Sequence, residues 1–429
     1  MTEGEGEPVA EGVTRDEPTH GKHEPSDADR DSHRTRVMLL GSGEFGRELA
    51  IAFQRLGAEV IAVERYADAP AHRVADQSLV VKLTDSDELT AVIGRLQPNF
   101  VVAVTDVVAP DALTAAAEGG FAEVFPTARS VRLTADREGL RRLAADELGL
   151  PTAPFWFAGS LDELRAVADH AGYPLRVQPA ARVAGQGQSV ISQPQDVEAA
   201  WQHALSAGGP LTHNRVMAET IVEVDVHVTL LTVRRDGPTG PVLEFCAPIG
   251  HDEPAGEVLE SWQPQEMSPV ALDAAKSIAA RIVKALGGRG LFGVELMVRG
   301  DEVYFNDVSA LPYEWGLVTL RTQRLSEFEL QARAILGLAA DTIMISPGAA
   351  QLIYSGHDAV DTVTEDTGPI GGALAQALEV PESDILVFDR HQPDGGRRRG
   401  LAVVTAADVA TARDRSRQMS VALRKVWHS

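Results

Sequence analysis

The chain has 429 residues, of which 44% are hydrophobic, 24% charged and 5% aromatic, and it carries a formal net charge of −23. This length accommodates two or three domains. The acidic balance argues against a nucleic-acid surface, whose affinity rests on Lys and Arg. The single cysteine, Cys246, excludes an internal disulfide and a cysteine metal cluster. With no apolar run of membrane-spanning length and no signal-peptide pattern, we expect a cytoplasmic protein without nucleic-acid or membrane partners.

The N-terminal segment, residues 1–35, is rich in Glu, Asp, Gly, Pro and His and has almost no large apolar side chains. A segment of this kind cannot bury enough apolar surface to offset the entropy lost on ordering. We therefore predict a disordered acidic tail over residues 1–35.

A glycine turn opens the remainder of the chain. The apolar run 37–40 leads into Gly41-Ser42-Gly43-Glu44-Phe45-Gly46, and a second apolar run, 60–63, ends in Glu64. This is the G-x-G-x-x-G turn of a βαβ unit with an acid about twenty residues further on. NAD binding is one interpretation, although the same turn serves any phosphate or small ligand at a helix N-terminus. An open parallel sheet ending near residue 130 is expected, with further strands at 78–81 and 100–104 and helices at 88–96 and from residue 111.

The middle of the chain predicts an antiparallel sheet with helices on one side and a mobile glycine loop at 181–188. Such an arrangement is typical of a nucleotide clamp rather than of a dehydrogenase. The periodicity places strands at 175–178, 189–191, 216–219, 222–228 and 243–249, and helices at 137–148, 161–170 and 269–286.

Two β-rich runs, 292–298 and 303–308, are joined by Arg299-Gly300-Asp301-Glu302, which has the form of a hairpin turn. Each run carries one acid within apolar sequence, Glu295 and Asp307. Two carboxylates on adjacent strands repel unless they share a cation, and hard oxygen ligands suit Mg²⁺ with nucleotide phosphates completing its shell. The alternative is a pair of acids at sheet edges that face water.

The last part of the chain predicts a helix at 325–338 and then a smaller β-rich region. Its strands are expected at 350–354, 384–388 and 401–404, with a final helix over 408–425. Arg390 and Arg397-Arg398-Arg399 flank a turn, where clustered guanidinium groups bind phosphate well. A solvated basic turn is an equally good interpretation.

Taken together, these residues resemble the ATP-grasp superfamily and, within it, the formate-dependent phosphoribosylglycinamide formyltransferases. The resemblance covers nearly everything from Arg36 onward. It implies an α/β protein with an N-terminal open parallel (pre-ATP-grasp) domain over 36–130, an ATP-grasp domain over 131–345 and a small C-terminal β-rich domain over 346–429. Its most specific segments are 37–46 (VMLLGSGEFG), 60–70 (VIAVERYADAP), 137–152 (REGLRRLAADELGLPT), 245–251 (FCAPIGH), 260–269 (ESWQPQEMSP) and 285–296.

The resemblance implies ATP and Mg²⁺ as cofactors and a homodimer. ATP phosphorylates formate, and the amine of glycinamide ribonucleotide attacks the resulting formyl phosphate. By position, Glu295 and Asp307 match the magnesium acids, and Glu314 stands near the acceptor amine as the candidate catalytic residue. The expected ATP contacts are Arg137, Gln178, Arg182, Gly185, Gly187, Glu219, Ile221, Val222 and His227. The expected contacts to the phosphoribosyl acceptor are Glu44, Phe45, Asp106, Arg390, Arg397 and Arg398.

Departures from the family pattern cluster in the ATP site. Gln178 and Gln186 stand where the family has lysines, and Leu311 where it has an arginine beside the reacting phosphates. His227 replaces a glutamate that holds the ribose, and Val104 replaces an acid that grips the acceptor, with Asp106 two residues on. Each charge-assisted phosphate contact is worth roughly 1.5–3 kcal/mol. Arg182, on the glycine loop, can restore one of the three lost cations.

Two hypotheses remain open at this point. The first is an ATP-grasp enzyme that keeps the family reaction or has changed its carboxylate and amine substrates. The second is a non-catalytic relative that binds a nucleotide or a phosphoribosyl ligand or serves as a partner subunit. The retained acids favour the first hypothesis, and the neutralised phosphate site favours the second.

Overall fold

The computed structural model describes residues 34–181, 187–208, 215–252, 258–354, 370–388 and 398–427. All the elements below belong to one compact unit, Thr35–Ser429. Within the described ranges, no helix has both the length and the apolar character needed to cross a membrane. The predicted tail, apart from its last two residues, lies outside the described residues, and so do Arg182, Gly185, Gln186, Arg390 and Arg397.

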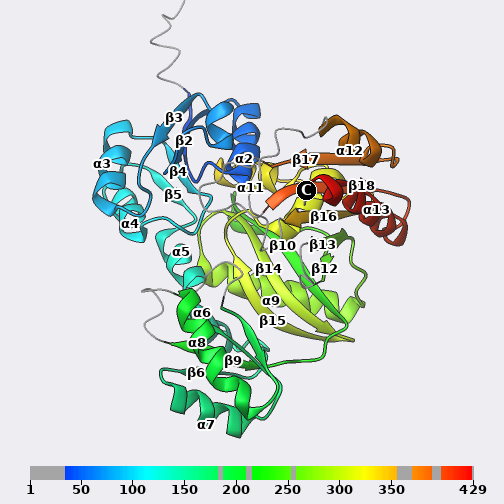
Figure 1. Ribbon diagram of the computed structural model, residues 1–429. Coiled ribbons are helices and arrows are strands. Elements are labelled where there is room, and N and C mark those ends of the chain that lie inside the picture. Colours follow the sequence, from blue (N-terminus) through cyan, green and yellow to red (C-terminus); the bar gives the residue numbers. More distant parts are fainter. Residues whose placement is uncertain are drawn as a thin grey trace, which may run out of the picture. The chain divides into compact units, whose positions relative to one another are not determined.

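The N-terminal part is the open parallel sheet that the sequence predicts, with strand order β3-β2-β1-β4-β5 (Figure 1). Gly41 has φ +108°, and a side chain there would collide with Thr105. A side chain on Gly46 would collide with the Gly41 carbonyl, so these two glycines allow α2 to pack tightly on the turn. The elements are β1 (Arg36–Leu40), α2 (Glu44–Arg55), β2 (Glu59–Glu64), η1 (Pro70–Arg73), β3 (Gln77–Val80), α3 (Ser86–Leu96), β4 (Phe100–Ala103), α4 (Pro110–Glu118) and β5 (Glu123–Phe125).

A second, four-stranded antiparallel sheet has the order β6-β9-β7-β8. Helices α7 and α8 bury their apolar faces on it around Leu164, Val177 and Trp201. The predicted helix 137–148 is α6 followed by a π-helical turn, η2. The elements are α5 (Ala128–Ala135), α6 (Arg137–Arg142), η2 (Leu143–Glu147), β6 (Phe155–Ala158), α7 (Leu161–Ala171), β7 (Leu175–Pro179), β8 (Ser189–Ile191), η3 (Pro194–Asp196), α8 (Val197–Gly208) and β9 (Val216–Thr220).

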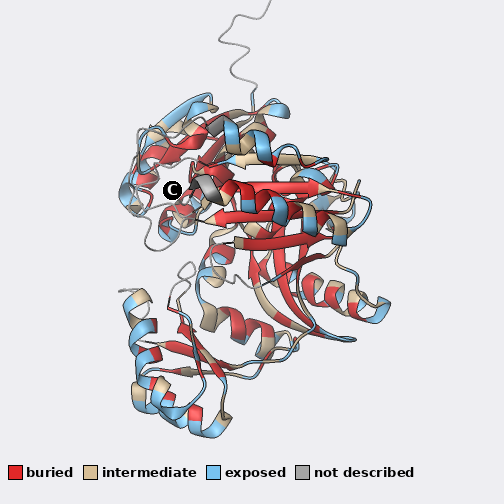
Figure 2. Ribbon diagram, turned by 45° about the vertical axis from the view of Figure 1, so that its right-hand side comes forward, coloured by how far each residue is buried: buried red, intermediate tan, exposed pale blue. Residues whose placement is uncertain are grey.

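The largest sheet has nine strands and runs through the proposed boundary between the central and C-terminal domains, because β13 pairs with β16. Its order is β15-β14-β10-β12-β13-β16-β18-β17, with β11 also paired to β10. Figure 2 shows these strands as predominantly buried. They are β10 (Val226–Gly237), β11 (Gly240–Phe245), β12 (Ile249–His251), β13 (Val258–Gln263), β14 (Gly290–Arg299), β15 (Glu302–Ser309), β16 (Gly348–Tyr354), β17 (Ser383–Val387) and β18 (Arg398–Thr405).

The strands expected to form one antiparallel sheet belong to two: β7, β8 and β9 lie in the four-stranded sheet, and β10, β11 and β12 in the nine-stranded one. Helices cover both faces of the nine-stranded sheet, so the expectation of helices on one side was wrong for its strands. Helix α9 packs on the face that carries Val228, Leu230 and Val294, whereas α11 packs on the opposite face with Leu231 and Val233. Helix α11 also contacts α2, which joins the nine-stranded sheet to the N-terminal sheet. The remaining helices are α9 (Pro269–Leu286), η5 (Glu314–Val318), α10 (Thr319–Thr322), α11 (Glu327–Ile335), α12 (Ile370–Ala377) and α13 (Val409–Trp427).

Two predicted strands have different limits in the structure. The expected strand at 222–228 begins at Val226, since Asp225 turns to accept a hydrogen bond from the Gly300 amide. The expected strand at 243–249 is divided into β11 and β12. Pro248 lies at this division and has no amide to donate to a ladder.

Candidate functional site

The predicted metal acids lie on the β14–β15 hairpin, directly opposite each other in the strand register. Asn306 is an extra residue in β15, and the resulting bulge sets Asp307 rather than Asn306 opposite Glu295. Val294 and Leu296 face α9, so the two carboxylates share the other face of the hairpin. The sequence predicted the hairpin and its acids, and both are present.

Glu295 is 9% exposed, and both of its carboxylate oxygens have donors. Asn306 Nδ2 donates to Oε2 at 3.2 Å, and the Tyr313 hydroxyl donates to Oε1. Asp307 Oδ1 accepts the Val308 amide at 2.7 Å. Two carboxylates and a neighbouring amide are the oxygen-rich donor set that Mg²⁺ takes when substrate phosphates supply the rest. The residues therefore fit a magnesium ion, although the described residues contain no group of three metal-ligating side chains.

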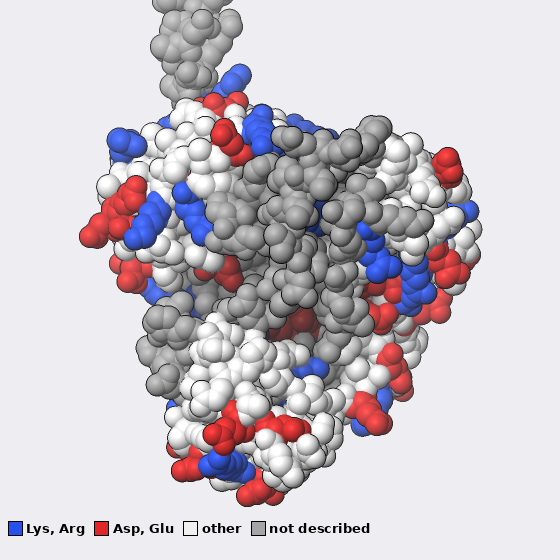
Figure 3. Space-filling model, in the orientation of Figure 1, with Lys and Arg blue, Asp and Glu red and all other residues white. Residues whose placement is uncertain are grey.

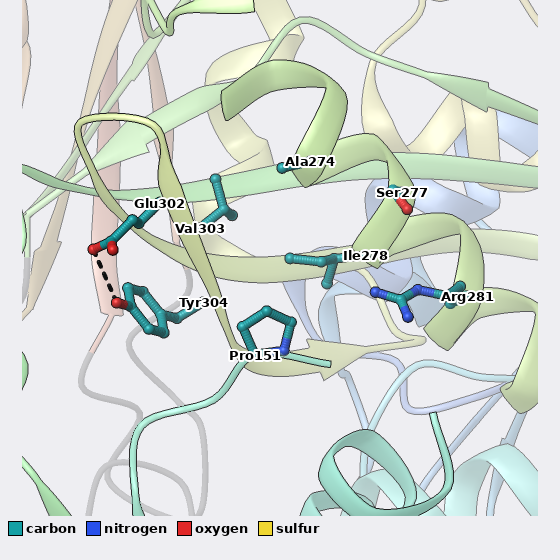
Figure 4. A pocket seen from close by; sticks show the side chains of 8 residues that line it. All are labelled: Pro151, Ala274, Ser277, Ile278, Arg281, Glu302, Val303 and Tyr304. Carbon is teal, nitrogen blue, oxygen red and sulfur yellow. Dashed lines mark hydrogen bonds between the residues drawn. The ribbon is translucent and has the colours of Figure 1, made fainter. Parts of the chain in front are cut away.

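The other face of the hairpin carries a shallow pocket of about 400 Å³ between α9 and β15 (Figure 4). Ile278, Val303 and Pro151 give it an apolar lining, and Arg281 and Glu302 lie at its margin. None of the predicted site residues lines it. Because the carboxylates point to the opposite face, this pocket has no part in the candidate site.

Glu219, the acid expected beside the adenine, is buried on β9 and faces two arginines. Arg141 Nη2 lies 3.0 Å from its Oε2, and Arg176 Nη1 lies 3.7 Å from its Oε1. The side chains of Arg141 and Glu219 are each 5% exposed. A buried ion pair of this kind requires such mutual satisfaction, because either charge alone would be strongly destabilising.

Arg137 holds the start of the glycine loop. Its guanidinium donates to the carbonyls of Pro179 and Ala181 at 3.3 Å each, and its amide donates to Ala180 O at 3.0 Å. Gln178 is buried on the neighbouring strand β7. At the other end of the loop, Gly187 has φ +79°, and a side chain there would lie 2.7 Å from Ala207 Cβ. Arg137 thus holds the backbone where the loop begins, and close packing against Ala207 requires a glycine at the other described end.

The remaining expected ATP contacts lie between β9 and β10. Ile221 and Val222 occupy the connection, and Ile221 is 37% exposed. His227, at the start of β10, lies with its ring centroid 6.0 Å from that of His251. Burial, with a smaller contribution from the nearby His227, lowers the pKa of His251 to about 3. His251 is therefore neutral, and it stacks on Trp315 at 3.8 Å.

The acceptor residues come together from three parts of the chain. Glu314 accepts a hydrogen bond from the Tyr354 hydroxyl at 2.8 Å and pairs with Arg398 Nε at 2.8 Å. The Arg398 guanidinium carbon lies 4.6 Å from the centre of the Phe45 ring. Burial, and then the neighbouring Glu314, raise the pKa of Tyr354, so its hydroxyl remains a proton donor. Glu44, beside Phe45, is buried and pairs with Arg47 at 2.8 Å.

Three further positions singled out in the sequence differ in how far they are exposed and in what they pack against. Asp106 is exposed in the loop after β4. Leu311 packs against the apolar core of the N-terminal sheet, and Val104 packs against the core that surrounds α11. Leucine and valine are therefore stabilised at these sites by apolar contacts, which a charged side chain would not make.

Five side chains that contact the expected site acids Glu219, Glu295 and Glu314 were not predicted from the sequence. They have no distinctive motif, and each acts on a residue distant in sequence or across a turn. The nearest available signal was the adjacency of Asn306 to Asp307 and of Tyr313 to Glu314. The five are Arg141, Arg176, Asn306, Tyr313 and Tyr354.

The ATP-grasp domain family matches residues 143–328, which contain the two acids of the hairpin and the expected nucleotide contacts from Gln178 to His227, whereas Arg137 and Arg141 lie just before the matched range. The formate-dependent phosphoribosylglycinamide formyltransferase of Corynebacterium glutamicum is 50% identical over 392 residues, 91% of this chain and 94% of that protein. The chain belongs to the formate-dependent phosphoribosylglycinamide formyltransferase family. This family consists of ATP-dependent ATP-grasp enzymes, so the glycine turn belongs to an ATP-grasp protein and not to a dehydrogenase.

Solved structures agree with the formyltransferase family assignment. The glycinamide-RNase-transformylase T of Mycobacterium tuberculosis has a TM-score of 0.77 and 58% identity, with 90% of this chain and 99% of that chain covered. The carboxyaminoimidazole ribonucleotide synthase of Aspergillus clavatus, solved with ATP, has a TM-score of 0.78, 20% identity and coverage of 92% and 99%. The second likeness concerns the fold alone. The roles of individual residues in this chain remain predictions.

Proposed function

We propose that the chain catalyses ATP-dependent formylation of glycinamide ribonucleotide with formate, as the names of its relatives state for those proteins. The observation that carries the proposal is that two consecutive residues, Tyr313 and Glu314, contact the two ends of the candidate site. Tyr313 donates to the proposed metal acid Glu295, and Glu314 pairs with the proposed acceptor residue Arg398.

The reaction has two steps. A formate oxygen attacks the γ-phosphorus of ATP and ADP leaves; the acceptor amine then attacks the formyl carbon, and phosphate and one amine proton leave. Glu295 and Asp307 would hold Mg²⁺, which neutralises phosphate charge when bound. Arg137 holds the backbone of residues 179–181, where the loop expected to cover the nucleotide begins. Glu314, oriented by Tyr354 and Arg398, would accept a hydrogen bond from the acceptor amine.

A second candidate is a non-catalytic protein that binds a nucleotide or a phosphoribosyl compound. The observation that favours it is the uncharged character of Gln178 and Leu311, where the family pattern has cations, together with the apolar packing of Leu311. Loss of two phosphate contacts weakens phosphoryl transfer more than it weakens binding of the acceptor, because charge on the transferring phosphoryl group must be stabilised in the transition state.

Two measurements distinguish these candidates. Calorimetric titration with a non-hydrolysable ATP analogue, with and without Mg²⁺, tests for metal-dependent nucleotide binding. Incubation with ATP, Mg²⁺, ¹³C-formate and glycinamide ribonucleotide, followed by mass spectrometry, tests for the labelled formyl product. Product formation supports the enzyme; nucleotide binding without product supports the binding protein; and no binding at millimolar nucleotide contradicts both nucleotide-dependent functions.

Two further assignments belong to this proposal. We expect a homodimer, which light scattering of the purified chain tests, and a cytoplasmic location, which fractionation of the producing cells tests.

On the face drawn in Figure 3, the described basic side chains are interspersed with acidic ones, which suits small anionic substrates better than a nucleic acid.

A further inference from the structure

Glu327 is a buried acid that the reaction proposed above does not use. It is the first residue of α11, and it is 0% exposed. It lies beneath Tyr313 and the first turn of η5, which together are called the loop 313–316. Its Oε2 accepts the Tyr313 amide at 3.0 Å. Its own amide donates to Thr319 Oγ1 at 2.9 Å, just beyond the loop. No cation pairs with Glu327 among the described residues, and an acid buried in this way is costly to ionise, so its presence calls for a specific reason.

The loop and the carboxylate are fitted to each other. A side chain at Gly316 would occupy the space of the Glu327 carboxyl group, so only glycine allows the backbone to approach this closely. On its other side the loop is held by Trp315, whose ring stacks on the neutral His251 at 3.8 Å. The backbone of residues 313–316 is therefore fixed between α11 and strand β12.

This loop carries the contacts that connect the two parts of the candidate site. The Tyr313 hydroxyl donates to Glu295, and Glu314 pairs with Arg398 and accepts from Tyr354. These two residues are adjacent in sequence, so a small shift of the loop backbone displaces both side chains together. A misplacement of about 1 Å is enough to cost a large factor in rate at sites of this kind.

We infer that Glu327 is a positioning residue, which holds the loop 313–316 so that Tyr313 supports the metal acid while Glu314 supports the acceptor. The inference deepens the proposed function and rests on it for the roles of Glu295 and Glu314. The contact of Glu327 with the loop is independent of those roles. It acts through geometry rather than charge, since the carboxyl oxygen only needs to accept the Tyr313 amide hydrogen.

The test compares Glu327→Gln, which keeps an oxygen in place, with Glu327→Asp, which withdraws it by one methylene. Hydrogen exchange of the peptide spanning 312–318 is followed by mass spectrometry in the full chain. We expect exchange about tenfold faster in Glu327→Asp, near wild-type exchange in Glu327→Gln, and no change in peptides of the N-terminal sheet. Glu329→Gln is the matched control, because Glu329 lies on the same helix but completes the Ser326 capping box.

Activity supplies the second measurement. In Glu327→Asp we expect kcat to fall and the KM for the acceptor to rise, each about tenfold, with both values restored in Glu327→Gln. If Glu327→Asp does not fold, Gly316→Ala tests the same contact by pushing the backbone away from an intact carboxylate. Wild-type exchange over 312–318 in Glu327→Asp or Gly316→Ala would overturn the inference. Faster exchange in a protein that makes no formyl product would leave the positioning contact supported and the proposed function contradicted.

Discussion

The acceptor end and the phosphate end of the candidate site are built from different chemistry. At the acceptor end, Glu314 is held by Arg398 and Tyr354, so charge and hydrogen bonding are matched within the chain. At the phosphate end, Gln178 is buried and neutral, and Leu311 packs into an apolar core. On the proposed residue roles, the acceptor end keeps a matched pair of charges at Glu314 and Arg398 although Val104 has lost an acid, whereas Gln178 and Leu311 at the phosphate end are both uncharged.

The region proposed to bind the base shows a third pattern, in which the acid Glu219 is paired with arginines of the chain itself. Arg141 and Glu219 form a buried pair whose partners are 78 residues apart. Removing Arg141 leaves Glu219 buried with the longer contact to Arg176, at 3.7 Å. We expect Arg141→Met to lower the free energy of unfolding by about 3 kcal/mol, the lower end of the range for breaking a buried pair, because Arg176 still offsets part of the charge. Denaturant unfolding measures the change.

The control for that experiment is Arg165→Met, because Arg165 pairs with Asp162 and Glu198 on an exposed helix face. A surface pair contributes about 0–1 kcal/mol. Equal losses of unfolding free energy in the two variants would show that the buried pair stabilises the chain no more than a surface pair does. Glu219 would then be available to a ligand.

Glu327 makes stability depend on pH. Burial, with a smaller contribution from the neighbouring Glu314, raises the pKa of Glu327 to about 8 even though the Tyr313 amide hydrogen bond lowers it. The folded chain therefore keeps a proton that the unfolded chain releases near pH 4.5, so the stability contributed by Glu327 is fully present below pH 4.5 and is lost as the pH rises through about 8. Glu327→Gln lacks this titration.

Thermal unfolding of the wild-type chain and of Glu327→Gln, measured from pH 5 to pH 9, checks this prediction. The difference in melting temperature, Glu327→Gln minus wild type, is expected to increase with pH and to level off above about pH 8. A difference that stays constant across the range would mean that the carboxyl group titrates alike in the folded and unfolded chains.

The metal acids give the next largest expected effect. Glu295→Gln removes one of two facing carboxylates, and we expect Mg²⁺-dependent nucleotide binding or turnover to fall roughly 100-fold, the upper range for groups that support a metal. Calorimetric titration with Mg²⁺ and an ATP analogue measures it. Asp273→Asn, an exposed acid on α9, is the control. An unchanged affinity in Glu295→Gln would remove the metal from the proposal.

Much of this architecture was predictable from local patterns. The turn at Gly300-Asp301 and the apolar alternation around Glu295 and Asp307 fixed the hairpin, and the glycine spacing fixed the parallel sheet. The bulge at Asn306 was not predictable, because one extra residue leaves the apolar pattern almost unchanged. The Arg141–Glu219 pair and the burial of Glu327 arise only from packing between distant segments. In the sequence Arg141 and Glu327 look like ordinary surface charges, and Glu219 was expected to contact ATP rather than an arginine.

Arg398 tests the acceptor end. Arg398→Gln removes a charge-assisted contact to Glu314, worth roughly 1.5–3 kcal/mol, so the KM for the acceptor should rise about tenfold or more while the KM for ATP stays within twofold. Steady-state kinetics with each substrate varied separately measures both values. Arg415→Gln, which disrupts a pair with Glu382, is the matched control. Equal increases in both KM values would indicate a general structural effect rather than a contact to the acceptor.

Gln178→Lys tests the phosphate end from the opposite direction, by restoring a cation. If the ancestral geometry persists, the lysine should tighten binding of the ATP analogue about tenfold, the lower part of the range for a charged phosphate contact.

Leu311→Arg is expected to behave differently, because Leu311 packs against the core of the N-terminal sheet and a guanidinium there would lose those contacts. The two single variants and the double variant should therefore be compared at equal folded fraction. A gain from Gln178→Lys alone would mean that this end was weakened one side chain at a time within a preserved frame. No gain would mean that β7 and the glycine loop now serve a ligand without a triphosphate.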